Sequence, residues 1–145
     1  MILLISIIIL GLVFDYINGF HDAANSISTI VTTKVLTPFQ AVIWAAFFNF
    51  LAFFISKYII GEFGIANTVS KTVYEQYITL PIILAGLIGA IIWNLFTWWR
   101  GIPSSSSHAL IGGFAGSAIM ANGFNAIHGA VILKIAAFIF LAPFI

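Results

Sequence analysis

The sequence carries very little charge for its length. It has 145 residues, of which 62% are hydrophobic and only 6% are Asp, Glu, Lys or Arg, and its mean hydropathy is +1.17. A soluble domain has about 25% charged residues. Five basic and four acidic residues are too few to cover a surface that faces water. The surface therefore has to face lipid.

Cysteine and clustered positive charge are also missing. With no cysteine, the chain can form neither a disulfide nor a thiolate metal site. The net charge is +1, and the five basic residues are scattered along the chain. They cannot form the basic patch that binds nucleic acid. Membrane lipid is the expected environment, and nucleic acid is not an expected partner.

Several apolar segments are long enough to cross a membrane, which takes about 20 residues in a helix. We predict spans at about 2–30, 38–60 and 78–99, an aqueous loop at 61–76 and a last apolar run at 132–145. Trp98, Trp99 and Arg100 mark a membrane boundary at the end of the third span. The first segment reads as a retained helix rather than a cleaved signal peptide, because no basic residue precedes it. The pattern predicts an all-α, polytopic membrane protein.

The stretch from 101 to 133 has no charge but many glycines. We predict two short helical pieces joined by a tight turn near 121–125, forming a re-entrant hairpin. Such a hairpin is tolerated at membrane depth only where protein or a water-filled cavity surrounds it. Residues 1–145 are expected to form one membrane domain. Because the last apolar run stops while still hydrophobic, we expect the chain to be truncated.

Polar residues form a stripe on the second half of the first segment. At 100° per residue they fall within about a third of the helix circumference. Carboxylates inside a membrane usually face a bundle interior or an aqueous cavity, and oxygen ligands suit hard cations such as Na⁺. Gly19 is expected to break the helix within this stripe. Alternatively, the carboxylates lie at the headgroup level and are simply solvated. The stripe consists of Asp15, Asn18, Asp22, Asn25, Ser26 and Thr29.

Four consecutive serines follow Pro103. Proline disfavours helix at the preceding residue and can begin one itself, so we expect a helix start here with Ser104 as its cap. The free N–H groups and hydroxyls of Ser104, Ser105, Ser106 and Ser107 would bind an oxyanion, phosphate most naturally. His108 either contacts this anion or packs against its neighbours. The serines could also serve only as a hydrated helix cap.

Taken together, an acidic face and an anion-binding helix start would couple the binding of a cation and an anion. Two other function classes are open at this point. A serine hydrolase could pair Ser104 or Ser105 with His108 at helical spacing. A structural or assembly subunit could use the polar groups for hydrogen bonds between helices.

Two motifs resemble those of a known family. NGFHDAANSIST (18–29) resembles the N-terminal signature of the inorganic phosphate transporter (PiT) family, and GIPSSSSHALIGG (101–113) resembles its serine–histidine signature. The resemblance implies uptake of inorganic phosphate across a bacterial or archaeal cytoplasmic membrane, driven by Na⁺ or H⁺. It implies no enzymatic activity and no cofactor beyond the coupling ion. The implied fold is two inverted repeats, each with a broken helix and a re-entrant hairpin.

The resemblance also assigns residues. Asp22 and Asn25 match the family's ion and phosphate site, and Ser104 to Ser107 match serines that contact phosphate. Thr29 is transferred as a cation-binding residue and His108 as an accessory one, with Na⁺ expected at Asp22 and Asn25. From the polar stripe itself we expect Asp15 to add to cation binding and Asn18 to be accessory. The chain corresponds to the first repeat only. Its site would therefore be completed by a separate second half or by an antiparallel homodimer partner.

Overall fold

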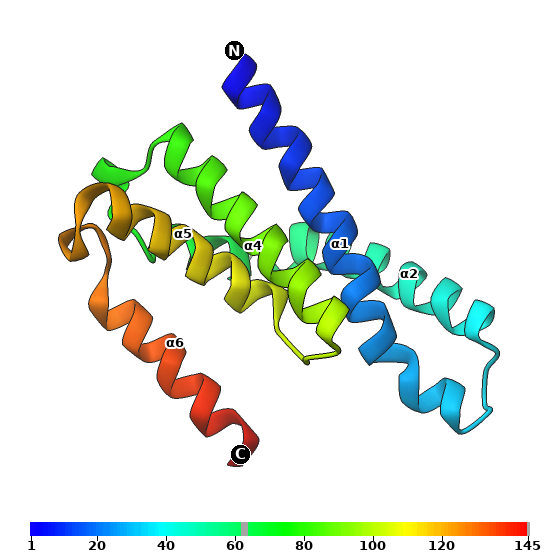
Figure 1. Ribbon diagram of the computed structural model, residues 1–145. Helices are drawn as coiled ribbons and strands as arrows, with labels where there is room; N and C mark the ends of the chain where they lie inside the picture. The colour runs from blue at the N-terminus through cyan, green and yellow to red at the C-terminus, as the bar shows by residue number, and fades with distance from the viewer. Residues whose placement is uncertain (62–63, 145) are drawn as a thin grey trace.

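The computed structural model describes residues 1–61 and 64–144 and is helical through almost all of that range (Figure 1). Within those residues the only β-type pairing is an isolated bridge between Val73 and Ile127. This confirms the all-α prediction. The α-helices are α1 (Ile2–Thr32), α2 (Pro38–Ile55), α3 (Gly64–Ser70), α4 (Leu80–Arg100), α5 (Ser106–Asn122) and α6 (Gly129–Leu141). Shorter helical turns are η1 (Ser56–Ile60), η2 (Glu75–Tyr77), η3 (Phe124–Ala126) and η4 (Ala142–Phe144).

Among the described residues, three helical segments are long and apolar enough to span a membrane: Ile2–Thr32, Pro38–Ile59 and Leu80–Arg100. They coincide with the three spans that the hydropathy predicts. Helix α2 illustrates the lipid-facing character, because Ala41 is its one buried residue while its many aromatic side chains are exposed. The last apolar run forms α6, which is shorter than these spans. The chain is therefore a multi-pass membrane protein.

Helix α1 is continuous through Gly19, so the prediction of a broken first helix is wrong. The residues that follow Gly19 make contacts that stabilise this stretch as a helix. The Phe20 ring packs edge-on against Trp98 of α4 at 5.4 Å between centroids, and His21 is buried. The hydroxyl of Ser26 donates to the backbone carbonyl of Ala23, one turn earlier. Packing and local hydrogen bonds outweigh the weak helix propensity of a single glycine.

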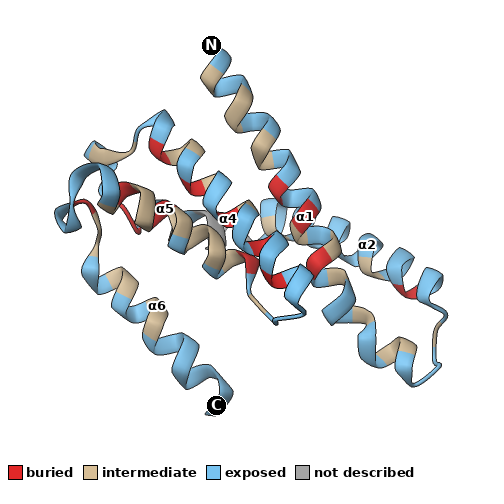
Figure 2. Cartoon of the chain, viewed as in Figure 1, coloured by how far each residue is buried: buried red, intermediate tan, exposed pale blue. Residues whose placement is uncertain are grey.

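Helices α4 and α5 form the best-packed part of the molecule and lie side by side in opposite directions (Figure 1). Gly86 and Gly113 let the two backbones touch, since a Cβ at Gly86 would lie only 2.9 Å from the Cα of Phe114. The Ser117 hydroxyl, 2.9 Å from the Ile82 carbonyl, donates to it across the pair. Buried residues accordingly concentrate on α4, α5 and the stretch of α1 that crosses α4 (Figure 2).

The turn after α5 lies where the sequence predicts it, beginning at Gly123 with a φ of +78°. The two helices that it joins do not pack on each other, because α5 lies along α4 while α6 leads away (Figure 1). Backbone hydrogen bonds tie this turn to the segment before α4. Tyr74 N–H donates to the Ala126 carbonyl at 3.0 Å, and His128 N–H donates to the Thr72 carbonyl at 2.9 Å. That the hairpin re-enters the membrane stays a prediction.

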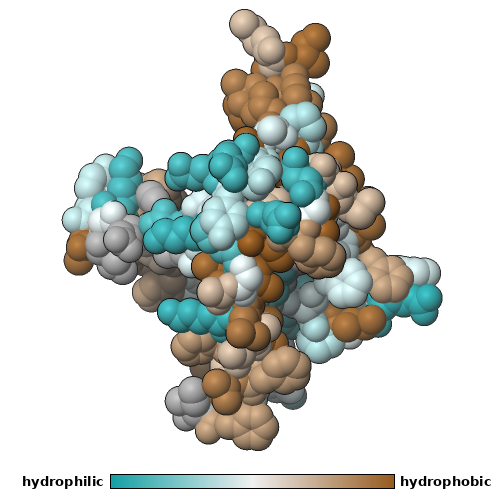
Figure 3. Space-filling model, turned by 90° about the vertical axis from the view of Figure 1, so that its left-hand side faces the viewer, coloured by the Kyte–Doolittle hydropathy of each residue, from teal (hydrophilic) through white to brown (hydrophobic). Residues whose placement is uncertain are grey.

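The loop predicted at 61–76 contains the short helix α3, while its residues 62 and 63 lie outside the described part. Seen from the side of the α5–α6 turn, polar side chains gather in the middle of the molecule. Apolar surface lies above and below them (Figure 3).

Candidate functional site

The serine segment forms the start of α5, as predicted, but the capping residue differs. Ser105, not Ser104, is the N-cap, and its hydroxyl accepts a hydrogen bond from the His108 N–H at 3.4 Å. Ser104 is held in the preceding loop, where its hydroxyl accepts from the Trp93 indole N–H at 3.0 Å. The N-cap is Ser105 instead of Ser104 because the hydrogen bond from the Trp93 indole holds Ser104 against α4.

The four serines divide between two sides of α5. Ser106 and Ser107 line the larger of two cavities next to the helix start. Ser104, Ser105 and His108 line a smaller cavity of about 390 Å³ against the Trp93 side of α4. The structure therefore does not gather the predicted serine cluster into one pocket.

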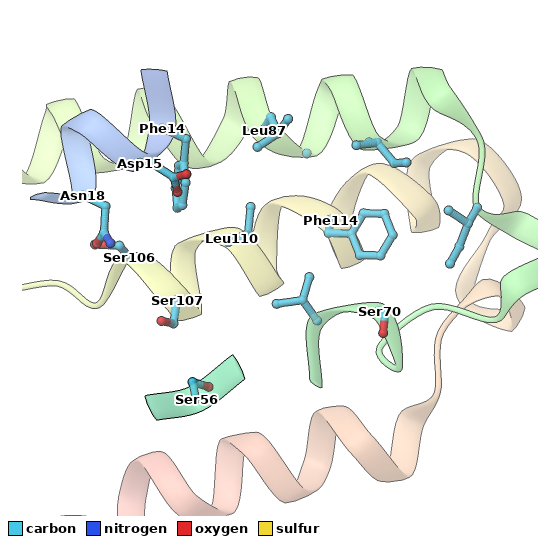
Figure 4. Close-up of a pocket in the computed structure, with 14 residues that line it drawn as sticks. Phe14, Asp15, Asn18, Ser56, Ser70, Leu87, Ser106, Ser107, Leu110 and Phe114 are labelled. Carbon is cyan, nitrogen blue, oxygen red and sulfur yellow. The ribbon is translucent and has the colours of Figure 1, made fainter. Parts of the chain in front are cut away.

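The larger cavity has a volume of about 710 Å³ and lies where α1, α4 and α5 meet the segments η1 and α3. Figure 4 shows Asp15 and Asn18 of α1 at the same end of this cavity as Ser106, with Ser107 nearby. The first turn of α5 leaves its backbone N–H groups without acceptors in the helix. Carboxylate and amide oxygens therefore share one cavity with hydroxyls and N–H donors. The polar residues that line it are Asp15, Asn18, Ser56, Ser70, Ser106 and Ser107.

Ser56 and Ser70 are the lining residues that sequence reasoning missed. Ser56 opens the π-helical turn after α2, and Ser70 ends α3. Neither belongs to a motif, and each comes to the cavity only because its segment folds back toward α5. No local pattern could have indicated them.

The remaining predicted residues of the stripe lie elsewhere on α1. Asp22, Asn25 and Thr29 are exposed, and they line neither of the two cavities at the start of α5. Asp22 does approach its buried neighbour His21, with 3.5 Å between its Oδ1 and the imidazole Nδ1. Ser26 lines a third cavity, between α1 and α2. The stripe is thus divided. Asp15 and Asn18 line the larger cavity, whereas Asp22, Asn25 and Thr29 lie on an exposed face of α1.

The hydrolase alternative requires a hydrogen bond between a serine hydroxyl and the His108 imidazole. In the part of the chain that the structure describes, the contact between Ser105 and His108 runs through the backbone N–H of the histidine. The imidazole itself has no serine partner there. The geometry does not form a serine–histidine dyad.

Comparison with known proteins identifies the chain. Residues 18–145 match the phosphate transporter family, a stretch that includes both motifs. The chain belongs to this family. Membership confirms the resemblance seen in the motifs and places the chain among transporters rather than enzymes. Together with its membrane-length helices, it makes this phosphate transporter family member a multi-pass protein of the cytoplasmic membrane.

Three curated relatives illustrate the similarity. A probable low-affinity inorganic phosphate transporter of Rhizobium meliloti (strain 1021) is 49% identical over 144 residues, covering 97% of the chain and 41% of the relative. A protein of the same description from Bacillus subtilis (strain 168) is 48% identical, covering 100% of the chain and 43% of the relative. The low-affinity inorganic phosphate transporter PitB of Escherichia coli (strain K12) is 37% identical over 112 residues, covering 72% of the chain and 21% of the relative. No solved structure matches the chain.

The chain spans less than half the length of these relatives. It spans 41% and 43% of the length of the first two. The exposed face that carries Asp22 and Asn25 belongs to a chain that covers less than half of each of these relatives.

Proposed function

We propose that this chain supplies half of the site of an ion-coupled transporter for inorganic phosphate. The observation that carries the proposal is the larger cavity, in which Ser106 and Ser107 at the start of α5 lie near Asp15 and Asn18 of α1. A helix start with free N–H groups and hydroxyl donors binds tetrahedral oxyanions without needing a lysine. Names of relatives that refer to inorganic phosphate support phosphate as that anion.

The coupling ion, Na⁺ or H⁺, binds on the α1 side in this proposal. Asp15 lines the larger cavity, and Asp22, Asn25 and Thr29 follow it on the same helix. A bound cation lowers the electrostatic cost of the phosphate, and the phosphate lowers that of the cation, because both lie in a medium of low dielectric constant. This mutual dependence would make uptake of one require the other.

The exposed part of the stripe is where the other half of the site docks. Asp22, Asn25 and Thr29 are exposed on a helix that is otherwise suited to lipid. Carboxylates are costly at membrane depth unless protein or water surrounds them. A second repeat half, or a second copy of the chain in antiparallel orientation, would cover this face. Asp22 and Asn25 would then face the second half, while Ser106 and Ser107 contact phosphate in the larger cavity.

Uptake of radiolabelled phosphate by the native assembly that contains this chain tests the proposal. Asp22→Asn should abolish ion-driven uptake while leaving the protein inserted in the membrane. Glu75→Gln, which removes a carboxylate from an exposed loop turn, is the matched control and should transport normally. Uptake at the wild-type rate in Asp22→Asn would refute the assigned role.

Measuring both phosphate binding and cation binding separates the role of the serines from that of the carboxylates. Ser106→Ala should weaken phosphate binding more than cation binding, since it removes a donor of the cavity. Ser28→Ala is the control, because the Ser28 hydroxyl donates to the Asn25 carbonyl of its own helix. Equal loss of phosphate and cation binding in Ser106→Ala would count against an anion site at the start of α5.

A further inference from the structure

A small group of buried polar atoms has no hydrogen-bond partner within the described part of the chain. They are the side-chain atoms Asn18 Oδ1, His21 Nδ1, Asn94 Oδ1, Asn94 Nδ2 and Ser106 Oγ. The residues Asn94, Ser106 and His21 are only 0%, 3% and 5% exposed. Buried polar groups in native proteins are nearly always paired, with protein or with ordered water. His21 Nδ1 lies 3.5 Å from Asp22 Oδ1 without a hydrogen bond between them. The other atoms need a partner that the described residues do not supply.

The five atoms belong to one region, the junction of α1, α4 and the start of α5. Asn18 and Ser106 line the same cavity and lie next to each other in Figure 4. On α4, Asn94 follows Trp93, whose indole bonds the loop before α5, and precedes Trp98, whose ring contacts α1. His21 adjoins the α1 residue that makes this ring contact. The residues with unpaired atoms thus belong to α1, α4 and α5, and α4 contacts both of the other helices.

The chemistry of these groups selects the partner. Asn94 leaves both an amide donor and an amide acceptor unpaired, and Asn18 leaves an acceptor. The Ser106 hydroxyl can donate and accept. A metal cation would satisfy only the acceptors. Inorganic phosphate could satisfy both kinds, because its P–OH group donates and its other oxygens accept, but only while it is bound. Water satisfies both kinds, and a buried water molecule typically makes about three hydrogen bonds.

We propose that ordered water molecules fill this junction and bridge Asn94 to His21, Asn18 and Ser106. Because these atoms are already buried in the chain, a further protein segment docked on its outer surface does not reach them. The water site does not depend on the proposed transport function. It bears on that function through Ser106, whose hydroxyl is hydrogen-bonded to water when no phosphate is bound.

Hydroxyl-radical labelling with an X-ray pulse tests for the water directly, because radicals form from bound water and oxidise the side chains beside it. The experiment uses the whole native protein in detergent, without phosphate. His21 and Ile82 are both 5% exposed, but Ile82 belongs to the apolar cluster at the other end of the α4–α5 pair. The oxidation rate of each residue is divided by the oxidation rate of the same residue in the unfolded protein. His21 should be oxidised severalfold faster than Ile82, and equal protection of both would overturn the proposal.

A substitution of the central amide gives a second, independent test. In Asn94→Leu, which nearly conserves volume, the bridging waters lose their partners on α4. The midpoint of thermal unfolding should therefore fall, and oxidation of His21 should decrease. Without water, the wild-type amide would be buried unpaired, and leucine would raise the midpoint. A raised midpoint would overturn the proposal. Asn49→Leu on the exposed face of α2 is the control and should leave the midpoint and the His21 oxidation unchanged.

The two measurements also separate this proposal from the transport function. Neither uses phosphate or a coupling ion, so a protein that transports nothing can still show labelling at His21. If Asn94→Leu does not fold, the comparison of His21 with Ile82 in the wild-type protein decides alone.

Discussion

Gly86→Ala tests the close contact between α4 and α5. The added Cβ would lie 2.9 Å from the Cα and 3.1 Å from the N of Phe114. Non-bonded carbon atoms prefer about 3.5–4.0 Å, so the helices would have to move apart by roughly 0.6–1 Å. Both contacted atoms belong to the backbone, and no change of rotamer can relieve them.

The magnitude follows from two opposing effects. Overpacking a well-packed contact costs about 1–3 kcal/mol, and replacing glycine by alanine within a helix returns about 0.5–1 kcal/mol. We expect a net loss of roughly 1–2 kcal/mol. For a protein of this size or larger, that lowers the midpoint of thermal unfolding by about 2–8 °C. Thermal unfolding of the purified protein in detergent, followed by circular dichroism, measures it.

Gly89→Ala is the matched control on the same helix. A Cβ at Gly89 would lie 3.9 Å from the Cα of Gly113, which is an ordinary contact. This variant should be as stable as the wild type or more stable by about 0.5–1 kcal/mol. If the Gly86 and Gly89 variants unfold at the same temperature, the backbone contact between α4 and α5 does not carry the stability assigned to it.

Two further predictions concern the start of α5. Ser105→Ala removes the N-cap and should cost about 1 kcal/mol of unfolding free energy, whereas Ser105→Gly should cost only a few tenths; equal stability of wild type and Ser105→Ala would contradict the capping role. Trp93→Phe and Ser104→Ala each remove the indole–hydroxyl hydrogen bond, worth about 0.5–1.5 kcal/mol. The double variant should therefore be little less stable than the worse single variant, and additive losses would show that the two side chains do not interact.

The membrane-spanning helices could be predicted because their signal is local. A run of about 20 apolar residues identifies a span wherever the rest of the chain lies, and the spans at 2–30, 38–60 and 78–99 correspond to α1, α2 with η1, and α4. The turn at Gly123 was predictable for the same reason, since glycine takes the positive φ that the turn uses. These features follow from composition and from single residues.

Features that depend on tertiary contacts were not predictable. The continuity of α1 through Gly19 depends on the contact of Phe20 with Trp98, which lie far apart in the sequence. The shift of the cap to Ser105 depends likewise on the indole of Trp93. Helical periodicity places residues on a face, but it does not say which neighbouring helix that face meets.

The same limit applies to the site. The sequence places Asp15 and Asn18 on one stripe with Asp22, and it groups all four serines. The structure divides both sets, because the first turn of α5 places Ser106 near α1 while the loop before it holds Ser104 against Trp93. Which members of a motif share a cavity is decided by helix packing, and a sequence pattern alone does not contain that information.

Helix α5 is held at its start and middle by α4 and at its end by the segment before α4. Trp93 bonds the loop that precedes it, Gly86 contacts its backbone, and the turn that follows it is hydrogen-bonded to Thr72 and Tyr74. Glycine-mediated contact leaves no gap along which one helix could slide past the other. The pair therefore behaves as one rigid body, and motion relative to it falls to α1, whose contact with α4 includes the rings of Phe20 and Trp98, side chains that can change rotamer.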